Sequence, residues 1–330
     1  MKYKSVMVTG RGSTDMLKIV EHDKRAPLAG EARVKILAVG VCQDDIAARV
    51  GNRPFLPKIP FAPGYAIIGD IEAVGEGVTN VQAGDRVGAL TKLGGYAEYI
   101  YWMSDKLVPA PPDLDPAKAV TLILNYLVAY QAMHRSVRVK AGDRALIIGA
   151  SGGVGTAFLD LGRLAGLTVY GTASKNKHRA LMEMGAVPID YHKQDFIEEI
   201  RLAEPAGLDY VFNGMGGDYL RRGVAVLRRG GQLVHYGAPE SFSGFLGLLA
   251  AFAWYNLLPN GKAIRGYGTH RVNQRLLVED WRTLFALLGQ RKIQPVIAGK
   301  FPILEAARAN ELLESGKVTG NVVLLSPELL

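Results

Sequence analysis

Cysteine is nearly missing from this sequence, since Cys42 is the only one in 330 residues. No disulfide can form within the chain, which fits a reducing compartment and argues against the disulfide-stabilised secreted class. The first residues also lack an apolar stretch of signal-peptide length. Together these absences predict a cytoplasmic protein.

The sequence also lacks an apolar run long enough to span a membrane. Its most apolar stretch, residues 245–258, ends before Pro259 and is shorter than the about 20 residues that a spanning helix needs. No transmembrane segment is therefore expected. We interpret this stretch as a buried helix, a subunit interface or a wall of a substrate pocket.

Signatures of nucleic-acid binding are absent, although the chain is basic. Lysine and arginine total 39 against 31 aspartates and glutamates, for a formal net charge of +8. No zinc finger, recognition helix or aromatic-basic RNA motif accompanies this charge. Most of it is interpreted as solvated surface, with a part that helps to attract phosphates, and no nucleic-acid partner is expected.

The pattern of apolar and polar residues along the chain changes near residue 122. Residues 1–122 are dense in short strands and turns, which predicts a compact, largely β domain. From 123 to 268 apolar strands alternate with helical segments, which is typical of a parallel, doubly wound sheet. The tail, residues 269–330, holds a further helix and strand and is expected to return to the first domain.

The predicted fold class is therefore α/β: a Rossmann doubly wound parallel sheet inserted in a discontinuous, β-rich domain. In the inserted part, strands are expected at 145–149, 168–172, 187–191, 208–212, 232–236 and 263–267. A helix is expected at 154–164, where apolar residues recur on one face.

A glycine-rich turn connects the first of these strands to that helix. Between Gly149 and Gly155 it contains Ala150, Ser151, Gly152, Gly153 and Val154. Gly152 lets the backbone approach a pyrophosphate, Gly155 permits close helix–strand packing, and the helix N-terminus favours the anion. A glycine pattern alone indicates only a tight turn, but between a strand and a helix it predicts a dinucleotide site.

The turn after the second strand contains no acidic residue from Gly171 to Arg179. An NAD site usually places Asp or Glu here, on the ribose 2′-hydroxyl. Hydroxyl and ammonium groups such as Ser174 and Lys177 complement a 2′-phosphate instead. The alternative is a solvated, basic helix start, but cations are unfavourable at that end of a helix. The sequence thus predicts NADPH (or NADP) rather than NADH.

These segments resemble the medium-chain dehydrogenase/reductase superfamily, in its zinc-independent quinone-oxidoreductase branch. The resemblance covers nearly the whole chain and rests on residues 63–64, 75–78, 83–87, 94–99 and 149–155. Residues 171–178 and 188–196 look most like the vesicle amine transport protein-like members. The resemblance implies a Rossmann domain within a split, GroES-like catalytic domain.

The zinc alcohol dehydrogenases of the same superfamily provide a contrast. Cys42 matches the segment that carries their catalytic cysteine ligand, but Tyr65 and Ala66 stand where they have a histidine and its acidic neighbour. Their third ligand falls near Asn125, and the four cysteines of their structural lobe are missing. One thiolate does not make a tetrahedral site, so no metal is expected.

The resemblance also assigns candidate site residues. Around the 2′-phosphate it implies Ser174, Lys177 and Tyr191, and along the rest of the cofactor Asn213, Gly214, Tyr236, Gly237, Ala238 and Asn321. Cys42 and Val128 replace the Asn and Thr that relatives often have beside the nicotinamide, which predicts a less polar pocket. Asp45, Asn125 and Trp254 are further pocket candidates.

Without zinc, the expected reaction is hydride transfer to a quinone or to a carbon–carbon double bond conjugated to a carbonyl. The charge that develops on oxygen can then be met by a hydrogen-bond donor. Tyr65 is the candidate donor, with a packing role as an equal alternative. Asp45 is interpreted as a cleft acid or a turn cap, and Cys42 as an inert buried side chain.

Two other classes of function stay open. The chain could be an NADPH-binding adaptor with vestigial catalysis, whose partner surface is 245–258, or a structural protein of the lens-crystallin kind. We also expect a homodimer, because a large apolar surface is rarely left exposed on a monomer. The last strand, 263–267, offers a free sheet edge, and in the resembled family that edge pairs with its two-fold mate.

Overall fold

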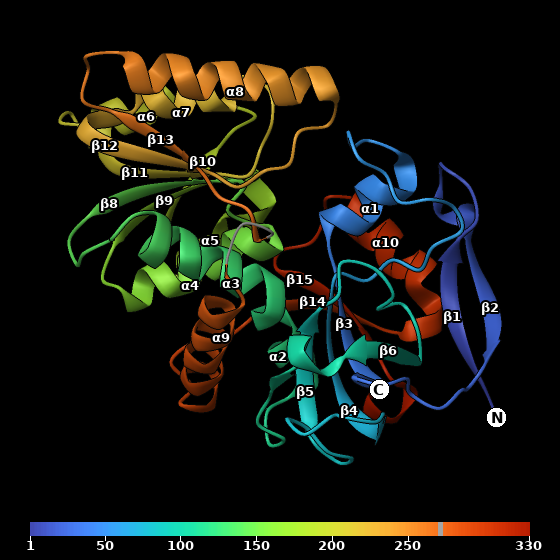
Figure 1. Ribbon diagram of the computed structural model, residues 1–330. Coiled ribbons are helices and arrows are strands. Elements are labelled where there is room, and N and C mark those ends of the chain that lie inside the picture. Colours follow the sequence, from blue (N-terminus) through green and yellow to red (C-terminus); the bar gives the residue numbers. More distant parts are fainter. Residues whose placement is uncertain (270–272) are drawn as a thin grey trace. The chain divides into compact units, whose positions relative to one another are not determined.

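The computed structural model describes residues 1–269 and 273–330, in two compact units (Figure 1). The first unit comprises Met1–Leu127 and Asn273–Leu330, and the second comprises Val128–Val272. The sequence pattern places these boundaries near 122/123 and 268/269.

A seven-stranded sheet forms the frame of the first unit, in the order β14-β15-β3-β4-β5-β7, with β6 paired to β3. Its strands are β3 (Glu31–Val41), β4 (Ala66–Val74), β5 (Arg86–Leu90), β6 (Tyr99–Met103), β7 (Val108–Pro109), β14 (Ile297–Pro302) and β15 (Asn321–Leu325). All pairs are antiparallel except β14 with β15. Since β15 pairs with β3, the two sequence segments of this unit share one sheet and one apolar core.

The remaining elements of the first unit lie around that sheet. They are the hairpin β1 (Lys2–Val8) with β2 (Leu17–Asp23), the helices α1 (Gln43–Val50), α2 (Pro116–Thr121), α9 (Gln274–Gly289) and α10 (Ala306–Glu314), and the 3-10 turns η1 (Thr14–Met16), η2 (Ser104–Lys106), η7 (Ile303–Glu305) and η8 (Pro327–Leu329). α2 begins at Pro116, which needs no N–H partner, and the Asp115 carboxylate caps it by accepting from Ala117 N at 2.9 Å.

The helical stretch after α2 has two π-helical segments. η3 (Leu122–Tyr126) follows α2 directly, and α3 (Leu127–Gln131) leads into η4 (Ala132–Ser136). π-helical turns are rare in proteins and often lie at functional sites. One candidate pocket residue, Asn125, is part of η3.

The second unit contains a six-stranded, all-parallel sheet in the order β10-β9-β8-β11-β12-β13. The strands are β8 (Arg144–Ile148), β9 (Thr168–Ala173), β10 (Ala186–Asp190), β11 (Leu208–Asn213), β12 (Leu227–His235) and β13 (Ala263–Gly266). Numbered within the sheet, this is the Rossmann order 3-2-1-4-5-6, whose switch point lies between β8 and β11. β12 begins well before its predicted start at residue 232, across a register shift against β11.

Helices cover both faces of this parallel sheet (Figure 1). α4 (Gly153–Leu164) and α5 (His178–Glu183), with the 3-10 turn η5 (Lys175–Lys177), lie on one face. α6 (Phe196–Ala203), α7 (Tyr219–Ala225) and α8 (Phe242–Leu257) lie on the other. The predicted fold class, a Rossmann sheet inserted in a discontinuous β-rich part, is confirmed.

α8 contains most of the apolar stretch 245–258. Leu248, Ala251, Phe252 and Tyr255 pack on the core of the second unit, yet no residue of the helix is fully buried. On the opposite side Leu246, Trp254 and Leu257 are exposed, Trp254 at 64%. The interpretation as a buried helix is therefore wrong for the single chain. Among the described residues, no helix combines the length and apolarity that crossing a bilayer requires.

Candidate functional site

The turn between β8 and α4 is the first part of the candidate site. Gly149 N donates to Thr172 Oγ1 at 2.9 Å, and Ala150 N donates to the Thr172 carbonyl at 3.1 Å. These two bonds fasten the turn to the end of β9. α4 then starts with Gly152 as its N-cap, which has no side chain to occupy the first N–H groups. Such N–H groups can bind a phosphate.

Two glycines in this segment meet very different surroundings. A Cβ on Gly155 would lie 2.3 Å from the Gly149 carbonyl oxygen, so only glycine allows α4 to approach the turn this closely. A Cβ on Gly152 would meet nothing nearer than 3.6 Å. Gly155 therefore serves internal packing, whereas the space beside Gly152 is open to a ligand.

Ala150 is the departure from glycine in this motif, and Gly171 of β9 compensates for it. A Cβ on Gly171 would lie only 2.7 Å from the Ala150 methyl group. The missing side chain at 171 thus makes room for the alanine, and the turn keeps its shape.

The acid-free turn after β9 lies beside the glycine-rich turn. Lys177 Nζ donates to Ser151 Oγ at 3.4 Å, and burial lowers the pKa of the Lys177 ammonium. Ser174 Oγ donates to Asn176 Oδ1 at 2.7 Å. The structure thus places the Lys177 ammonium against Ser151 of the glycine-rich turn. Tyr191, 46% exposed, follows the neighbouring strand β10, and its ring lies tilted against that of His192, with 4.2 Å between the ring centroids.

The carboxyl ends of β11 and β12 form the third part of the candidate site. The Asn213 side chain is fully buried; its Oδ1 accepts from Met215 N at 2.9 Å, while its Nδ2 has no partner among the described residues. A Cβ on Gly237 would lie 2.5 Å from the Gly214 carbonyl oxygen, so the two strand ends touch. Between them the Tyr236 ring packs on Phe158, and Ala238 is exposed. An unused buried donor at this edge fits a polar ligand.

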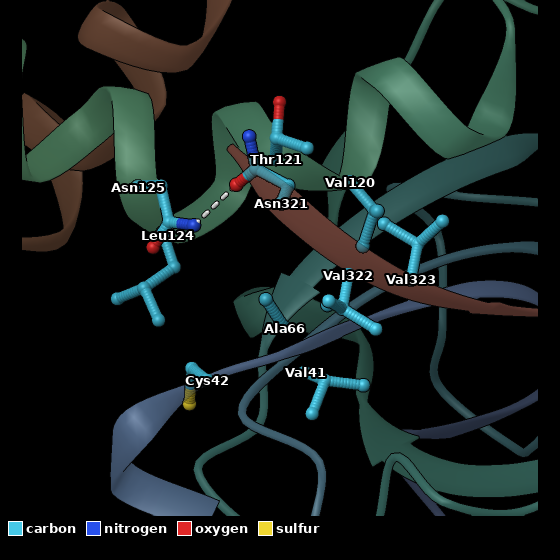
Figure 2. Close-up of a pocket in the computed structure, with 11 residues that line it drawn as sticks. Val41, Cys42, Ala66, Val120, Thr121, Leu124, Asn125, Asn321, Val322 and Val323 are labelled. Atoms are coloured by element: carbon cyan, nitrogen blue, oxygen red, sulfur yellow. Dashed lines mark hydrogen bonds between the residues drawn. The ribbon is translucent and has the colours of Figure 1, made fainter. Parts of the chain in front are cut away.

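A small cavity in the first unit gathers three candidate residues. Cys42, Asn125 and Asn321 line it, together with Gly40, Val41, Ala66, Val120, Thr121, Leu124, Val322 and Val323. Asn125 Nδ2 donates to Asn321 Oδ1 at 2.6 Å, as Figure 2 shows. Asn321 Nδ2 in turn donates to the Val296 carbonyl at 3.0 Å. The cavity has a volume of about 10 Å³, which is room for about one water molecule.

Asp45 has a different place from the one expected of a cleft acid. Its Oδ2 accepts from Cys42 N at 3.0 Å and Cys42 Sγ at 3.2 Å, and its Oδ1 accepts from Gly64 N at 2.8 Å. The Tyr96 hydroxyl donates to Oδ2 at 3.4 Å. The carboxylate thus caps α1, and it is absent from the cavity lining. Burial raises the pKa of Asp45 to about 6, although these donors oppose the shift.

The Cys42 thiol is held by this carboxylate. Burial raises the pKa of Cys42 well above its usual value, and the neighbouring Asp45 charge raises it further. A thiol in this environment stays protonated and is a poor nucleophile. The structure therefore supports the interpretation of Cys42 as an inert side chain.

The other candidates do not line this cavity. The Tyr65 carbonyl accepts from Thr91 N at 2.9 Å and Lys92 N at 3.1 Å, and Tyr65 is outside the lining. Val128 and Trp254 belong to the second unit, where Val128 is buried and Trp254 is on α8. Of the predicted pocket residues, Cys42 and Asn125 line the cavity, together with Asn321 of the predicted cofactor site, and Asp45 bonds to Cys42 without lining it.

Comparison with known proteins agrees with this architecture. Residues 28–112 match the alcohol dehydrogenase GroES-like domain, and residues 184–324 match the zinc-binding dehydrogenase family. The human synaptic vesicle membrane protein VAT-1 homolog is 32% identical over 98% of this chain and 86% of its own length. The chain belongs to the medium-chain dehydrogenase/reductase superfamily.

Within the superfamily, solved structures match the whole chain. Escherichia coli quinone oxidoreductase complexed with NADPH has a TM-score of 0.88 at 25% identity, covering 98% of this chain and 99% of that one. A mycobacterial protein complexed with NADPH has a TM-score of 0.85 at 27% identity and the same coverage. The resemblance to the quinone-oxidoreductase branch and to VAT-1 is confirmed.

One family description includes zinc. Next to Cys42, the cavity wall has Ala66 and Asn125, neither of which is a usual zinc ligand. In residues 1–269 and 273–330, no three His, Cys, Asp or Glu side chains gather as a metal ion requires. Zinc independence stays a prediction.

Sequence reasoning missed two side chains of the site. Thr172 holds the glycine-rich turn through its hydroxyl, and Tyr96 bridges Asp45 to Asn310 Nδ2, which donates to the Tyr96 hydroxyl at 3.2 Å. Thr172 and Tyr96 both lie in segments that carry the family resemblance, so the sequence could have drawn attention to them. It could not show which residues they bond to.

Proposed function

We propose that this chain is an NADPH-dependent oxidoreductase that transfers hydride, without zinc, to a quinone or an α,β-unsaturated carbonyl compound. The observation that carries the proposal is the contact of Lys177 with Ser151, which puts a cation of an acid-free turn on the glycine-rich motif. The NADPH complexes of two structural relatives support the same cofactor. We also propose the cytoplasm as its location, on the basis of its single cysteine.

The cofactor would be held mainly by the second unit. The backbone of the turn and the start of α4 would bind the pyrophosphate, and Ser174, Lys177 and Tyr191 the 2′-phosphate. Asn213 Nδ2 would donate to the nicotinamide half, with Gly214, Tyr236, Gly237 and Ala238 beside it. Asn321 completes the proposed set. When bound, the nicotinamide supplies the hydride, and these residues orient it.

The acceptor would be a small, apolar and planar molecule. The residues beside Cys42 and Asn125 are mainly aliphatic, which favours such a substrate. Because the enclosed cavity holds only about one water molecule, these residues would form one wall of the substrate pocket and not the whole of it. Tyr65 remains our candidate hydrogen-bond donor, and Val128 and Trp254 remain candidate pocket residues. Tyr65→Phe tests the first assignment: kcat/KM should fall while the Kd for NADPH stays constant.

The test of the proposed function is NADPH oxidation with a panel of quinones and enones. Turnover with at least one class, and with a product reduced by two electrons, is the expected result. Tight NADPH binding without turnover on any acceptor would favour the adaptor alternative, for which the VAT-1 relatives and the exposed face of α8 are the supporting observations.

We further propose a homodimer formed through α8 and β13. β13 is the terminal strand of the sheet, so its outer edge has no partner strand in the described residues. Leu246, Leu249 and Leu257 expose apolar surface on the neighbouring helix, and such surfaces usually form interfaces. Light scattering of dilute protein without lipid should give the mass of two chains, and Leu249→Glu should give one. A wild-type monomer contradicts the proposal.

A further inference from the structure

β13 is the terminal strand of the parallel sheet, paired with β12 alone among the described strands. The backbone groups of successive strand residues face alternate sides. Tyr267 N, directly after β13, donates to the His235 carbonyl of β12 at 2.9 Å. The odd-numbered residues of this segment therefore face β12, and Ile264 turns its N–H and C=O groups to the outer edge of the sheet.

The Asn256 carboxamide occupies this outer edge. Its Oδ1 accepts from Ile264 N at 3.0 Å, and its Nδ2 donates to the Ile264 carbonyl at 3.0 Å. A residue on an antiparallel neighbouring strand would exchange the same two bonds with Ile264. Because Ile264 N can only donate, the contact also fixes which atom of the carboxamide is the oxygen.

α8 holds this carboxamide in place. Asn256 lies one turn after Phe252, and its Nδ2 also donates to the Phe252 carbonyl at 2.8 Å. The Phe252 ring lies close to β13, since a Cβ on Gly266 would be 2.9 Å from it. The helix and the strand are thus packed together, and the carboxamide bonds to the backbone of both.

A second asparagine binds the preceding outward-facing amide. Asn260 Oδ1 accepts from Lys262 N at 2.9 Å, in the turn that leads from α8 into β13. Side chains from the end of the helix thus bind both the Lys262 and the Ile264 N–H groups. Unpaired groups of a terminal strand are a template for pairing with another chain, so such side chains protect the edge.

We propose that Asn256, with Asn260 beside it, closes the outer edge of β13 against pairing with the strand of a second copy. This inference rests on the proposed homodimer, and it names the surface on which the two copies meet. A second strand would have to displace the Asn256 carboxamide from Ile264. Contact between the copies is then left to the exposed apolar side chains of α8, which include Leu246, Leu249 and Leu257.

The distribution of charge favours the same arrangement. No residue from Ser241 to Gly261 is charged, so α8 can face α8 of a second copy without repulsion between like charges. On the short segment 262–266, by contrast, two-fold strand pairing would bring Lys262 and the exposed Arg265 close to the same cations of the second copy. Like charges on neighbouring strands are destabilising.

Hydrogen exchange of single amides, followed by NMR in the full chain, tests the closed edge. Leu249→Glu, whose mass is checked by light scattering, is the monomeric background in which no second copy can protect β13. There the Ile264 and Lys262 amides should exchange as slowly as in the wild type. Adding Asn256→Ala should speed exchange of the Ile264 amide about tenfold and leave that of Lys262 unchanged. Asn260→Ala, the matched control, should do the reverse.

Asn256→Asp separates loss of the cap from damage to α8. Its carboxylate still accepts from Ile264 N but donates to neither carbonyl, so the Ile264 amide should stay protected. Equal acceleration in Asn256→Asp and Asn256→Ala would assign the effect to the helix and overturn the inference. Unaltered exchange in Asn256→Ala would overturn it too, and a dimer that survives Leu249→Glu contradicts the contact through α8.

The same measurements distinguish failure of this inference from failure of the proposed homodimer. A wild-type monomer in which Asn256 protects the Ile264 amide refutes the homodimer but supports the closed edge. A wild-type dimer whose Ile264 amide loses its protection in Leu249→Glu alone supports the homodimer. It refutes the closed edge, because the protection then comes from a strand of the second copy.

Discussion

The glycine-rich turn of the second unit and the cavity region of the first present their polar groups in opposite ways. In the turn, the donors belong to the backbone, and the side chains that could cover them are missing at Gly152 and Gly153. Near the cavity, a polar side chain is already satisfied within the protein: Asp45 accepts from the backbone N–H groups of Cys42 and Gly64 and from the Tyr96 hydroxyl.

This difference separates a site that is prepared for a ligand from one that is mainly held together internally. Unpaired N–H groups at a helix start can be exposed to solvent at little cost, because water hydrogen-bonds to them. They therefore stay available to bind an anion. A buried carboxylate without hydrogen-bond donors would be very unfavourable. The donors to Asp45 accordingly come from three parts of the chain. The two regions should therefore respond differently to substitution.

The largest effect is expected for Gly155→Ala. The new methyl group would collide with the Gly149 carbonyl, so unfolding should become easier by about 3 kcal/mol, and NADPH affinity should fall at least 100-fold. Gly152→Ala is the matched control, because its methyl has space. It should leave the urea midpoint unchanged and weaken NADPH binding alone. Equal stability of both variants would show that the turn is not packed as described.

The second effect concerns Asp45 and the dependence of stability on pH. Its folded pKa of about 6 lies above the unfolded value of about 3.9. The stability that this group contributes is therefore fully present below the unfolded pKa and is lost as pH rises through 6. Relative to Asp45→Asn, the wild type should be more stable at pH 4.5 than at pH 7.5 by about 2 kcal/mol.

Urea unfolding of both proteins at the two pH values measures this difference. Asp105→Asn, at an exposed site, is the control for a general change in charge. A wild-type advantage that stays constant between pH 4.5 and 7.5 would mean that Asp45 does not carry a raised pKa.

A smaller effect is expected for cofactor preference. The wild type should bind NADPH at least tenfold more tightly than NADH, a difference of about 1.4 kcal/mol. Lys177→Glu should erase this preference, because the new carboxylate repels the 2′-phosphate. Lys175→Glu makes the same charge change at an exposed position of the same turn and should preserve it. Isothermal titration of both cofactors decides, and equal Kd values in the wild type refute the assignment.

Treatment with a metal chelator is expected to have no effect on activity. Elemental analysis should find no stoichiometric zinc, and a chelator should leave activity intact, because Ala66 and Asn125 line the cavity beside Cys42. Zinc that is lost together with activity would show that the cavity recruits a metal through ligands not recognised in the sequence.

Local pattern was sufficient for most of the second unit. The strands at 208–212 and 263–267 lie within one residue of β11 and β13, since a buried parallel strand is a short apolar run between turns. β12 was placed too short because Arg228 to Gly231 look like a turn, yet they continue the strand across a register shift. Here tertiary pairing overrode local propensity.

The candidate site of the first unit was less predictable. The sequence suggested Cys42, Asn125 and Asn321, but not that Asn125 and Asn321 bond to each other across 196 residues. The sequence left two interpretations of Asp45 open, an acid in the cleft or a turn cap. Its hydrogen bonds to Cys42 and Gly64 favour the cap.

By itself, the sequence determined the Rossmann order of strands and helices, the glycine-rich turn and the absence of an acid after β9. These features depend on residues close together in the chain, where periodicity and turn chemistry act directly. The tertiary structure decided which side chains share the cavity and which carboxylate is buried. Burial and electrostatic interaction depend on distances in space between segments remote in sequence, and only the folded chain sets those distances.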